Sequence, residues 1–253
     1  MTMFSLDHLV INTRFNLDPY RVFFSTLGFT LTPKSRHSLG SVNHLILFQD
    51  TYLELIGLER DGPVRAEILE SRMGIDGLVL KMEAEQAVLN GLEKAGLRAT
   101  APQRFSRQVE NGKAAEFIAV RLEPGQFDEG RVYFCRHLTP DLVWQPAYMS
   151  HANGVSGIGK LTIAASDPQA TQEAYNQLGK PAGTRIDFPG LKEAKERFRL
   201  DKVRADRFLA ITFTGTDLDR LAGFLRDAKL SYFFIGESIL VHLKDGSVLE
   251  FES

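Results

Sequence analysis

Two residues in the first quarter of the chain carry side chains that commonly hold metal ions. His8 lies in the apolar stretch 6–11, and Glu54 lies in the apolar stretch 52–56. Both stretches are short and rich in β-forming residues, which is typical of strands. Alternate residues of a strand face the same side, so His8 and Glu54 share their faces with apolar neighbours. A carboxylate on a buried face needs a partner or a metal; the alternative is that Glu54 lies at an edge or at the surface.

Imidazole and carboxylate together suit a divalent ion such as Zn, Fe(II), Mn or Ni. A catalytic metal site uses about three protein ligands and keeps one position open. The most economical third ligand is His137, which ends the predicted strand that begins at Arg131. The alternative role of His137 is to cap a turn before Pro140. The sequence thus predicts a metal held by His8, Glu54 and His137, with Glu54 also counted as catalytic.

Further polar residues could contact a substrate. His151 lies in a His-Ala-Asn-Gly loop and could act as a general base because its reference pKa is near neutrality, or it could be a polar turn residue. Cys135 shares a strand face with His137, although a lone cysteine is more often a small buried apolar residue. Trp144 could wall an apolar pocket or pack at the joint between two halves of the chain.

The elements that must position these residues follow a repeating order. After the first strand, Asp18 and Pro19 open a helix, with Asp18 as its cap, and the helix stops at Gly28. Strands are predicted at 29–33, 43–48 and 51–56, which gives the order β-α-β-β-β. The same order returns further along, so the chain reads as a duplicated supersecondary unit.

Four such units are predicted near residues 5–57, 74–137, 157–203 and 206–252. The third is cut short, because residues 185–202 are charged and indicate loop and helix. We expect an α+β fold of repeated βαβββ units with curled mixed sheets in two fused halves, residues 1–152 with two units and residues 153–253 with one truncated and one complete unit.

The composition excludes several classes of protein. The 253 residues are 43% hydrophobic and 25% charged with a formal net charge of −2, so neither a nucleic-acid surface nor an acidic tail is expected. One cysteine, no secretory signal and no apolar run of membrane-spanning length indicate a cytoplasmic protein that does not engage membranes. No glycine-rich phosphate loop is present, so no nucleotide cofactor is expected. Exposed sheet edges would allow a homodimer.

The chain resembles the vicinal-oxygen-chelate superfamily, the glyoxalase, bleomycin resistance and extradiol dioxygenase group. The resemblance is carried by Asp-His-Leu-Val-Ile at 7–11, Leu-Gly-Phe at 27–29 and Tyr-Leu-Glu-Leu-Ile at 52–56. The segments 133–144 and 151–154 look like the glyoxalase-like branch of that group. The resemblance covers most of the chain and is most specific in the first unit.

The resemblance implies that paired units curl around a pocket, where a His from a first strand and a Glu from a last strand hold a metal. Two neighbouring oxygens of the substrate would chelate that metal. His8 and Glu54 match this pattern, and it places Asn43 on a strand that lines the pocket. It also ranks His151 above His37, which lies in a polar loop. At the His position the other units carry Gly77, Lys160 and Leu209; at the Glu position the fourth unit carries Glu250, for which an exposed edge-strand acid is the favoured interpretation.

Two hypotheses for the function follow. The first is a metal-dependent lyase, isomerase or dioxygenase that acts on a small substrate with vicinal oxygens, bound with the help of Asn43, Cys135 and Trp144. The second is a metal-free protein of the same fold that binds or sequesters a small molecule. The missing ligands in the second unit favour the second hypothesis.

Overall fold

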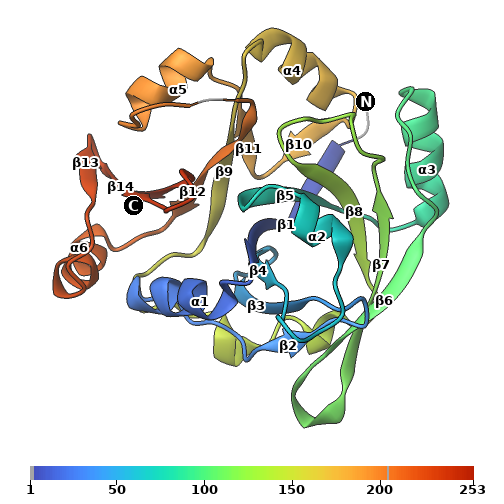
Figure 1. Cartoon of the computed structure of the whole chain (residues 1–253), viewed down its shortest axis with the longest axis horizontal. Helices are drawn as coiled ribbons and strands as arrows, with labels where there is room; N and C mark the ends of the chain where they lie inside the picture. The colour runs from blue at the N-terminus through green and yellow to red at the C-terminus, as the bar shows by residue number, and fades with distance from the viewer. Residues whose placement is uncertain (1–2, 204) are drawn as a thin grey trace.

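The computed structural model describes residues 3–203 and 205–253, which form two curved sheets side by side (Figure 1). The first sheet has the strand order β2-β3-β4-β1-β5-β8-β7-β6, with β10 paired to β1. The second has the order β11-β9-β12-β15-β14-β13. The predicted α+β fold of βαβββ units with curled mixed sheets is confirmed. We call residues 3–152 the N-terminal half and the described residues from 153 onward the C-terminal half.

The N-terminal half holds two units of matching order. The first consists of β1 (Met3–Arg14), α1 (Leu17–Thr26), β2 (Ser35–Arg36), β3 (Val42–Leu47) and β4 (Tyr52–Gly57). The short helix α2 (Ala66–Glu70) connects it to the second unit, which consists of β5 (Gly74–Lys81), α3 (Glu85–Lys94), β6 (Gln103–Gln108), β7 (Ala114–Arg121) and β8 (Arg131–His137). One 3-10 turn, Glu110–Gly112, lies between β6 and β7, and two more, Pro140–Leu142 and Pro146–Tyr148, follow β8.

The C-terminal half begins with the truncated unit. It has β9 (Gly157–Ala164), α4 (Pro168–Asn176), β10 (Lys180–Ala182), β11 (Arg185–Asp187) and α5 (Leu191–Arg197). The fourth unit is complete, with β12 (Arg207–Thr214), α6 (Leu218–Asp227), β13 (Phe233–Ile235), β14 (Ser238–His242) and β15 (Val248–Glu252). In the truncated unit β10 joins the first sheet, and β11 pairs in parallel with β9 as β15 pairs with β12. The segment 185–202 thus contains the short strand β11 as well as the predicted helix, α5.

Two local predictions for the first unit are wrong. The α1 helix begins at Leu17, so Asp18 lies inside its first turn, and the residue before the helix, Asn16, makes no side-chain cap hydrogen bond. Burial of Leu17 explains the earlier start. No strand forms at 29–33 within the described residues; Thr32 makes an isolated pair of hydrogen bonds with Leu45, and Pro33 has no N–H with which to extend it.

The first sheet curls into a nearly closed barrel. Its central strands β1 and β5 run antiparallel, and its two ends meet where His37, just after β2, forms an isolated bridge with Arg107 of β6. Side chains that point inward, including Val10, Leu45 and Phe117, form a separate core inside the barrel. Closure of the sheet at His37 therefore brings two segments, about seventy residues apart in sequence, to the interior of the same barrel.

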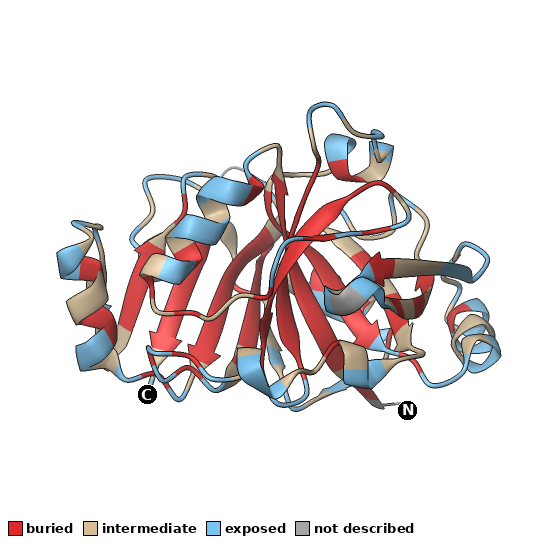
Figure 2. Cartoon of the chain, turned by 90° about the horizontal axis from the view of Figure 1, so that it is seen from below, coloured by how far each residue is buried: buried red, intermediate tan, exposed pale blue. Residues whose placement is uncertain are grey.

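A shared hydrophobic core joins the two halves. Figure 2 shows most strands of the two sheets as buried, with exposed residues on the helices around them. Phe29 and Phe48 of the N-terminal half pack against Phe213 of β12, with ring centroids 5.2 and 6.2 Å away. At Gly28, where φ is +86°, a Cβ would lie 2.5 Å from the Phe224 ring, so glycine permits this close approach. In the described parts of the chain, no helix has the length and apolar character to span a membrane.

Candidate functional site

Glu54 of β4 lies inside the barrel with two histidines facing its carboxylate. The side chain is 5% exposed, and Asn43 of β3 donates a hydrogen bond from Nδ2 to Oε1 at 2.7 Å. His8 Nε2 lies 3.8 Å from Oε2, and His37 Nε2 lies 3.7 Å from Oε1. The interior thus combines two imidazole nitrogens with one carboxylate.

Both histidines are held through the nitrogen that faces away from Glu54. His8 Nδ1 donates to Asp7 Oδ1 at 2.6 Å, and His37 Nδ1 hydrogen-bonds to the Ser41 hydroxyl at 2.8 Å. A hydrogen bond at Nδ1 fixes the ring and leaves Nε2 with its lone pair, which is how metal-binding histidines are usually oriented. The His8 ring also stacks on Tyr52 with centroids 4.2 Å apart, which further restricts its rotation.

The protonation states suit a cation. Burial alone would raise the pKa of Glu54, but the nearby His37 and His8 and the Asn43 amide lower it below its ordinary value, so the carboxylate is ionised. Burial lowers the pKa of His37 to about 4, which keeps its ring neutral near pH 7. Two imidazoles and a carboxylate form the donor set of many Fe(II), Mn and Zn sites. The side chains present therefore fit a divalent metal held by His8, His37 and Glu54.

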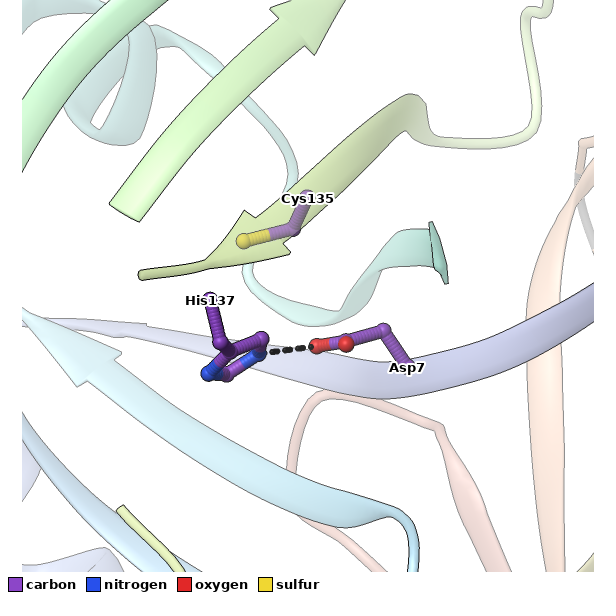
Figure 3. A group of neighbouring side chains, drawn as sticks. All are labelled: Asp7, Cys135 and His137. Atoms are coloured by element: carbon purple, nitrogen blue, oxygen red, sulfur yellow. Dashed lines mark hydrogen bonds and ion pairs between the residues drawn. The ribbon is translucent and has the colours of Figure 1, made fainter. Parts of the chain in front are cut away.

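A second group of donors lies behind His8. Asp7 Oδ1 also accepts a hydrogen bond from His137 Nε2 at 3.0 Å, and one ligand atom each of Asp7, Cys135 and His137 lies within 4.8 Å of the others (Figure 3). Burial would raise the pKa of Asp7, but the bonds from His137 and His8 hold it far below its ordinary value. Burial raises the pKa of Cys135, which therefore stays a thiol, a weak ligand and a weak nucleophile. Asp7 thus positions both histidines.

The structure brings together some of the residues predicted from the sequence. His8, Glu54 and Asn43 meet inside the barrel, and Cys135 lines the same cavity. His137 is joined to this group through Asp7, and the Trp144 ring lies 4.8 Å from the His137 ring.

His151 lies elsewhere, at the joint between the halves. Its Nδ1 accepts a hydrogen bond from the Thr30 amide at 3.1 Å, and its Nε2 donates to the Leu47 carbonyl at 3.0 Å. Both ring nitrogens are therefore engaged by the backbone, which is the arrangement of a structural histidine.

His37 is a candidate metal ligand that the sequence analysis ranked below His151. The polar segment around it suggested an exposed loop, yet the side chain is 7% exposed and points at Glu54. Its position depends on the bridge with Arg107, a contact that the local sequence pattern does not predict. The sequence analysis also did not single out Arg65, Arg107 and Arg121, which line the same cavity.

The space inside the barrel is small but lies beside larger hollows. The inner cavity has a volume of about 30 Å³, room for roughly two water molecules. It shares Arg121 and Tyr133 with a hollow of about 720 Å³, and it shares Arg107 with another of about 350 Å³. Arg107, Arg121 and Tyr133 are thus the side chains that the inner cavity shares with these two hollows.

The C-terminal half has a glutamate at the matching place in its sheet. Glu54 lies beside Val10 of β1, and Glu250 of β15 lies beside Thr212 of β12. By the same register Ala210, and not Leu209, corresponds to His8.

The favoured interpretation of Glu250 as an exposed edge-strand acid is wrong. Its strand β15 lies between β12 and β14, and the side chain is 7% exposed. Lys160 Nζ lies 3.2 Å from Oε2, Arg197 Nη2 lies 3.3 Å from it, and Thr212 Oγ1 donates to it at 2.5 Å. Glu250 is buried because it is fully paired.

Comparisons with known proteins identify the fold and the family. A model of the family described as glyoxalase-like domain matches residues 6–179. A search of curated proteins found no match. One similar solved structure is a hypothetical protein from Staphylococcus aureus, with 12% identity and a TM-score of 0.69 over 98% of this chain and 99% of that one.

Two further similar solved structures carry the name of a dioxygenase fusion protein and of a synthase. One is a xylose isomerase-like TIM barrel/4-hydroxyphenylpyruvate dioxygenase fusion protein, with 12% identity, a TM-score of 0.63 and coverage of 98% of this chain and 48% of that one. The other is a mutant of 4-hydroxymandelate synthase from Streptomyces coelicolor, with 12% identity, a TM-score of 0.57 and coverage of 98% and 91%. At this identity the likeness shows the fold alone. Because the family model spans more than half of its residues, the chain belongs to the glyoxalase-like domain family of the vicinal-oxygen-chelate superfamily.

Proposed function

We propose that this protein is a metal-dependent enzyme of the glyoxalase or dioxygenase type that acts on a small substrate with vicinal oxygens. The observation that carries the proposal is the convergence of His8 Nε2 and His37 Nε2 on the Glu54 carboxylate, at 3.8 and 3.7 Å. In this proposal His37 takes the third ligand position that the sequence analysis gave to His137. The related dioxygenase fold supports the reaction class, and the substrate stays open.

The chain's own residues have distinct tasks in this site. A bound divalent metal would act as a Lewis acid toward neighbouring substrate oxygens. Asp7 accepts the Nδ1 proton of His8 and keeps Nε2 free as a ligand. Asn43 donates to Glu54 Oε1 and lies 3.4 Å from His37 Nε2, so it aligns the carboxylate with the second imidazole. Apolar and aromatic side chains around the cavity, such as Phe117 and Tyr52, exclude bulk water.

The alternative function is metal-free binding of a small molecule. One observation favours it: the second unit contributes Tyr133 and Cys135 to the cavity, where a metal enzyme with two equivalent units would supply ligands. Under this alternative Glu54 serves as a hydrogen-bond acceptor in a binding pocket.

Metal content separates the two functions. Protein purified without chelators or an affinity tag is analysed for Fe, Mn, Ni and Zn, as wild type and as His8→Ala and His37→Ala. We expect near-stoichiometric metal in the wild type and its loss in both variants. A matched control is His44→Ala, because His44 lies on the neighbouring strand β3 with Nδ1 bonded to the Thr32 carbonyl. Wild-type protein that stays metal-free even after reconstitution would leave only the binding function.

A further inference from the structure

The inner cavity is cationic around its single glutamate. Three arginines, Arg65, Arg107 and Arg121, line it together with Glu54. Two of them already have an acidic partner, since Glu67 of α2 pairs with Arg65 and lies 3.6 Å from Arg121 Nε. The third arginine differs in its surroundings.

Arg107 is buried and, among the described residues, forms no ion pair with a carboxylate. The residue is only 3% exposed. Its guanidinium donates a long hydrogen bond from Nη1 to the Ser35 hydroxyl, at 3.4 Å. Among the residues that the structure describes, none hydrogen-bonds to its buried Nε. Burial lowers the pKa of Arg107, but a guanidinium remains protonated in proteins. Glu54, in the same cavity, is the carboxylate that acts on this charge, without an ion pair to it. A buried cation that lacks an ion pair is unfavourable, so the protein holds a positive charge ready for an anion.

The position of Arg107 relates this charge to the proposed metal ligands. Its backbone is the bridge partner of His37, so the guanidinium projects into the same interior as the His37 ring. Arg107 also lines the outer hollow of about 350 Å³. The other two basic residues of that hollow already have acidic partners, Lys34 in Asp18 and Arg36 in Glu59. A small anion that enters the hollow therefore meets Arg107 as its free cationic partner among the described residues.

We infer that Arg107 is the receptor for a carboxylate group of the substrate, so that the substrate is a small carboxylic acid carrying its vicinal oxygens. This inference rests on the proposed function for the metal and adds the chemical class of the substrate. A planar carboxylate suits the site because a guanidinium binds it with two parallel hydrogen bonds. The narrow interior beside the stacked Phe105 and Phe117 rings, 5.1 Å apart, favours a flat group over a tetrahedral phosphate.

The test uses metal-free protein, so that binding to the metal plays no part. Calorimetric titrations of chelator-treated, dialysed protein compare oxalate with its neutral isostere oxamide and with inorganic phosphate. We expect oxalate to bind at least about tenfold more tightly than oxamide or phosphate, since a hydrogen bond to a charged group is worth roughly that factor. Arg107→Met should weaken oxalate binding by about 10- to 100-fold, and Arg107→Lys by less.

A control variant lies on the same strand. Arg104 is exposed and pairs with Glu116, so Arg104→Met should leave oxalate affinity unchanged. Equal affinity for oxalate and oxamide, tighter binding of phosphate, or full oxalate affinity in Arg107→Met would overturn the inference. If Arg107→Met does not fold, the wild-type comparison of oxalate with oxamide and the Arg107→Lys titration decide.

The same variants separate this inference from the proposed function. Arg107→Met leaves His8, His37 and Glu54 in place and should keep the wild-type metal content. His37→Ala should lose metal yet still bind oxalate in the metal-free titration within a few-fold of wild type. An absent metal with intact oxalate binding would contradict the proposed function alone, and the reverse result would contradict the anion receptor alone.

Discussion

The two halves of the molecule place a buried glutamate at the same point of their sheets and surround it differently. Across the first strand from Glu54, β5 carries Gly77 beside Val10; across the first strand from Glu250, β9 carries Lys160 beside Thr212. A Cβ at Gly77 would lie 2.7 Å from the Val10 side chain, so this position supplies no charged group to Glu54, whose carboxylate faces two imidazoles. Lys160, at the corresponding position, lies 3.2 Å from Glu250 and neutralises it.

The helix α5 completes the difference. Arg197 at its end reaches Glu250, and its Nη1 also lies 3.5 Å from Asp187. In this unit β11 is the edge of the sheet: no described strand pairs with its outer side as β14 pairs with β15, and α5 follows it in the chain. The two carboxylates thus differ in their direct partners. Glu54 hydrogen-bonds to an amide and faces two imidazoles, whereas Glu250 pairs directly with two fixed cations and becomes part of the core.

The largest expected effect comes from exchanging each glutamate for glutamine. Glu54→Gln should lower the affinity for the divalent metal by more than about 100-fold, because a charged ligand is lost and even outer-shell partners are worth 10- to 100-fold. Glu250→Gln should leave metal affinity within about twofold. Metal titration of apo-protein measures both, and equal losses in the two variants would remove the distinction between the halves.

A smaller effect is expected when the cation of the C-terminal half is removed. Lys160→Met leaves the buried Glu250 with Arg197 alone, and we expect the free energy of unfolding to fall by about 2–3 kcal/mol, somewhat less than for a buried pair left with no partner. Urea denaturation measures the change, and the exposed Lys192 of α5 provides the control variant Lys192→Met. A loss below about 0.5 kcal/mol would show that the Lys160–Glu250 pair does not stabilise this half.

The smallest effect concerns the histidine between the halves. Burial lowers the pKa of His151 despite the bond to Leu47, so the folded protein binds its proton less readily than the unfolded chain. Its stabilisation is therefore complete above the unfolded pKa of about 6.5 and is lost as the pH falls below that value, with a slope of up to about 1.4 kcal/mol per pH unit. His151→Asn should flatten the dependence of the unfolding free energy on pH between about 6.5 and 5. An unchanged slope in metal-free protein would show that His151 does not titrate on unfolding.

The repeated architecture could be predicted from the sequence because each unit carries its own local signals. Short local patterns predict the strand around His8, the helix end at Gly28 and the strand around Glu54. The charged segment 185–202 predicts the truncation of the third unit. Asp167 and Asp217 cap α4 and α6, each accepting a hydrogen bond from a backbone amide three residues on.

The rest of the site depends on contacts between distant segments. His37 and Arg107 become neighbours only when the sheet curls, and Asp7 gains its role from His137 at the other end of the half. The one-residue shift between Leu209 and Ala210 likewise follows from strand register, which turn geometry and packing fix together. Sequence periodicity gives the face of a strand but not its partner.

The pairing of β10 with β1 has a consequence for how the chain folds. Phe4 pairs with Pro181 and Ser5 with Ala182. The first residues of β1 therefore gain this strand partner only when residues near position 180 are present. Contacts this distant along the chain carry a high loop-closure cost and form late. We therefore expect the barrel to mature after α4 has emerged from the ribosome, and a fragment that stops at residue 152 to expose an unpaired edge at its own beginning, prone to aggregation.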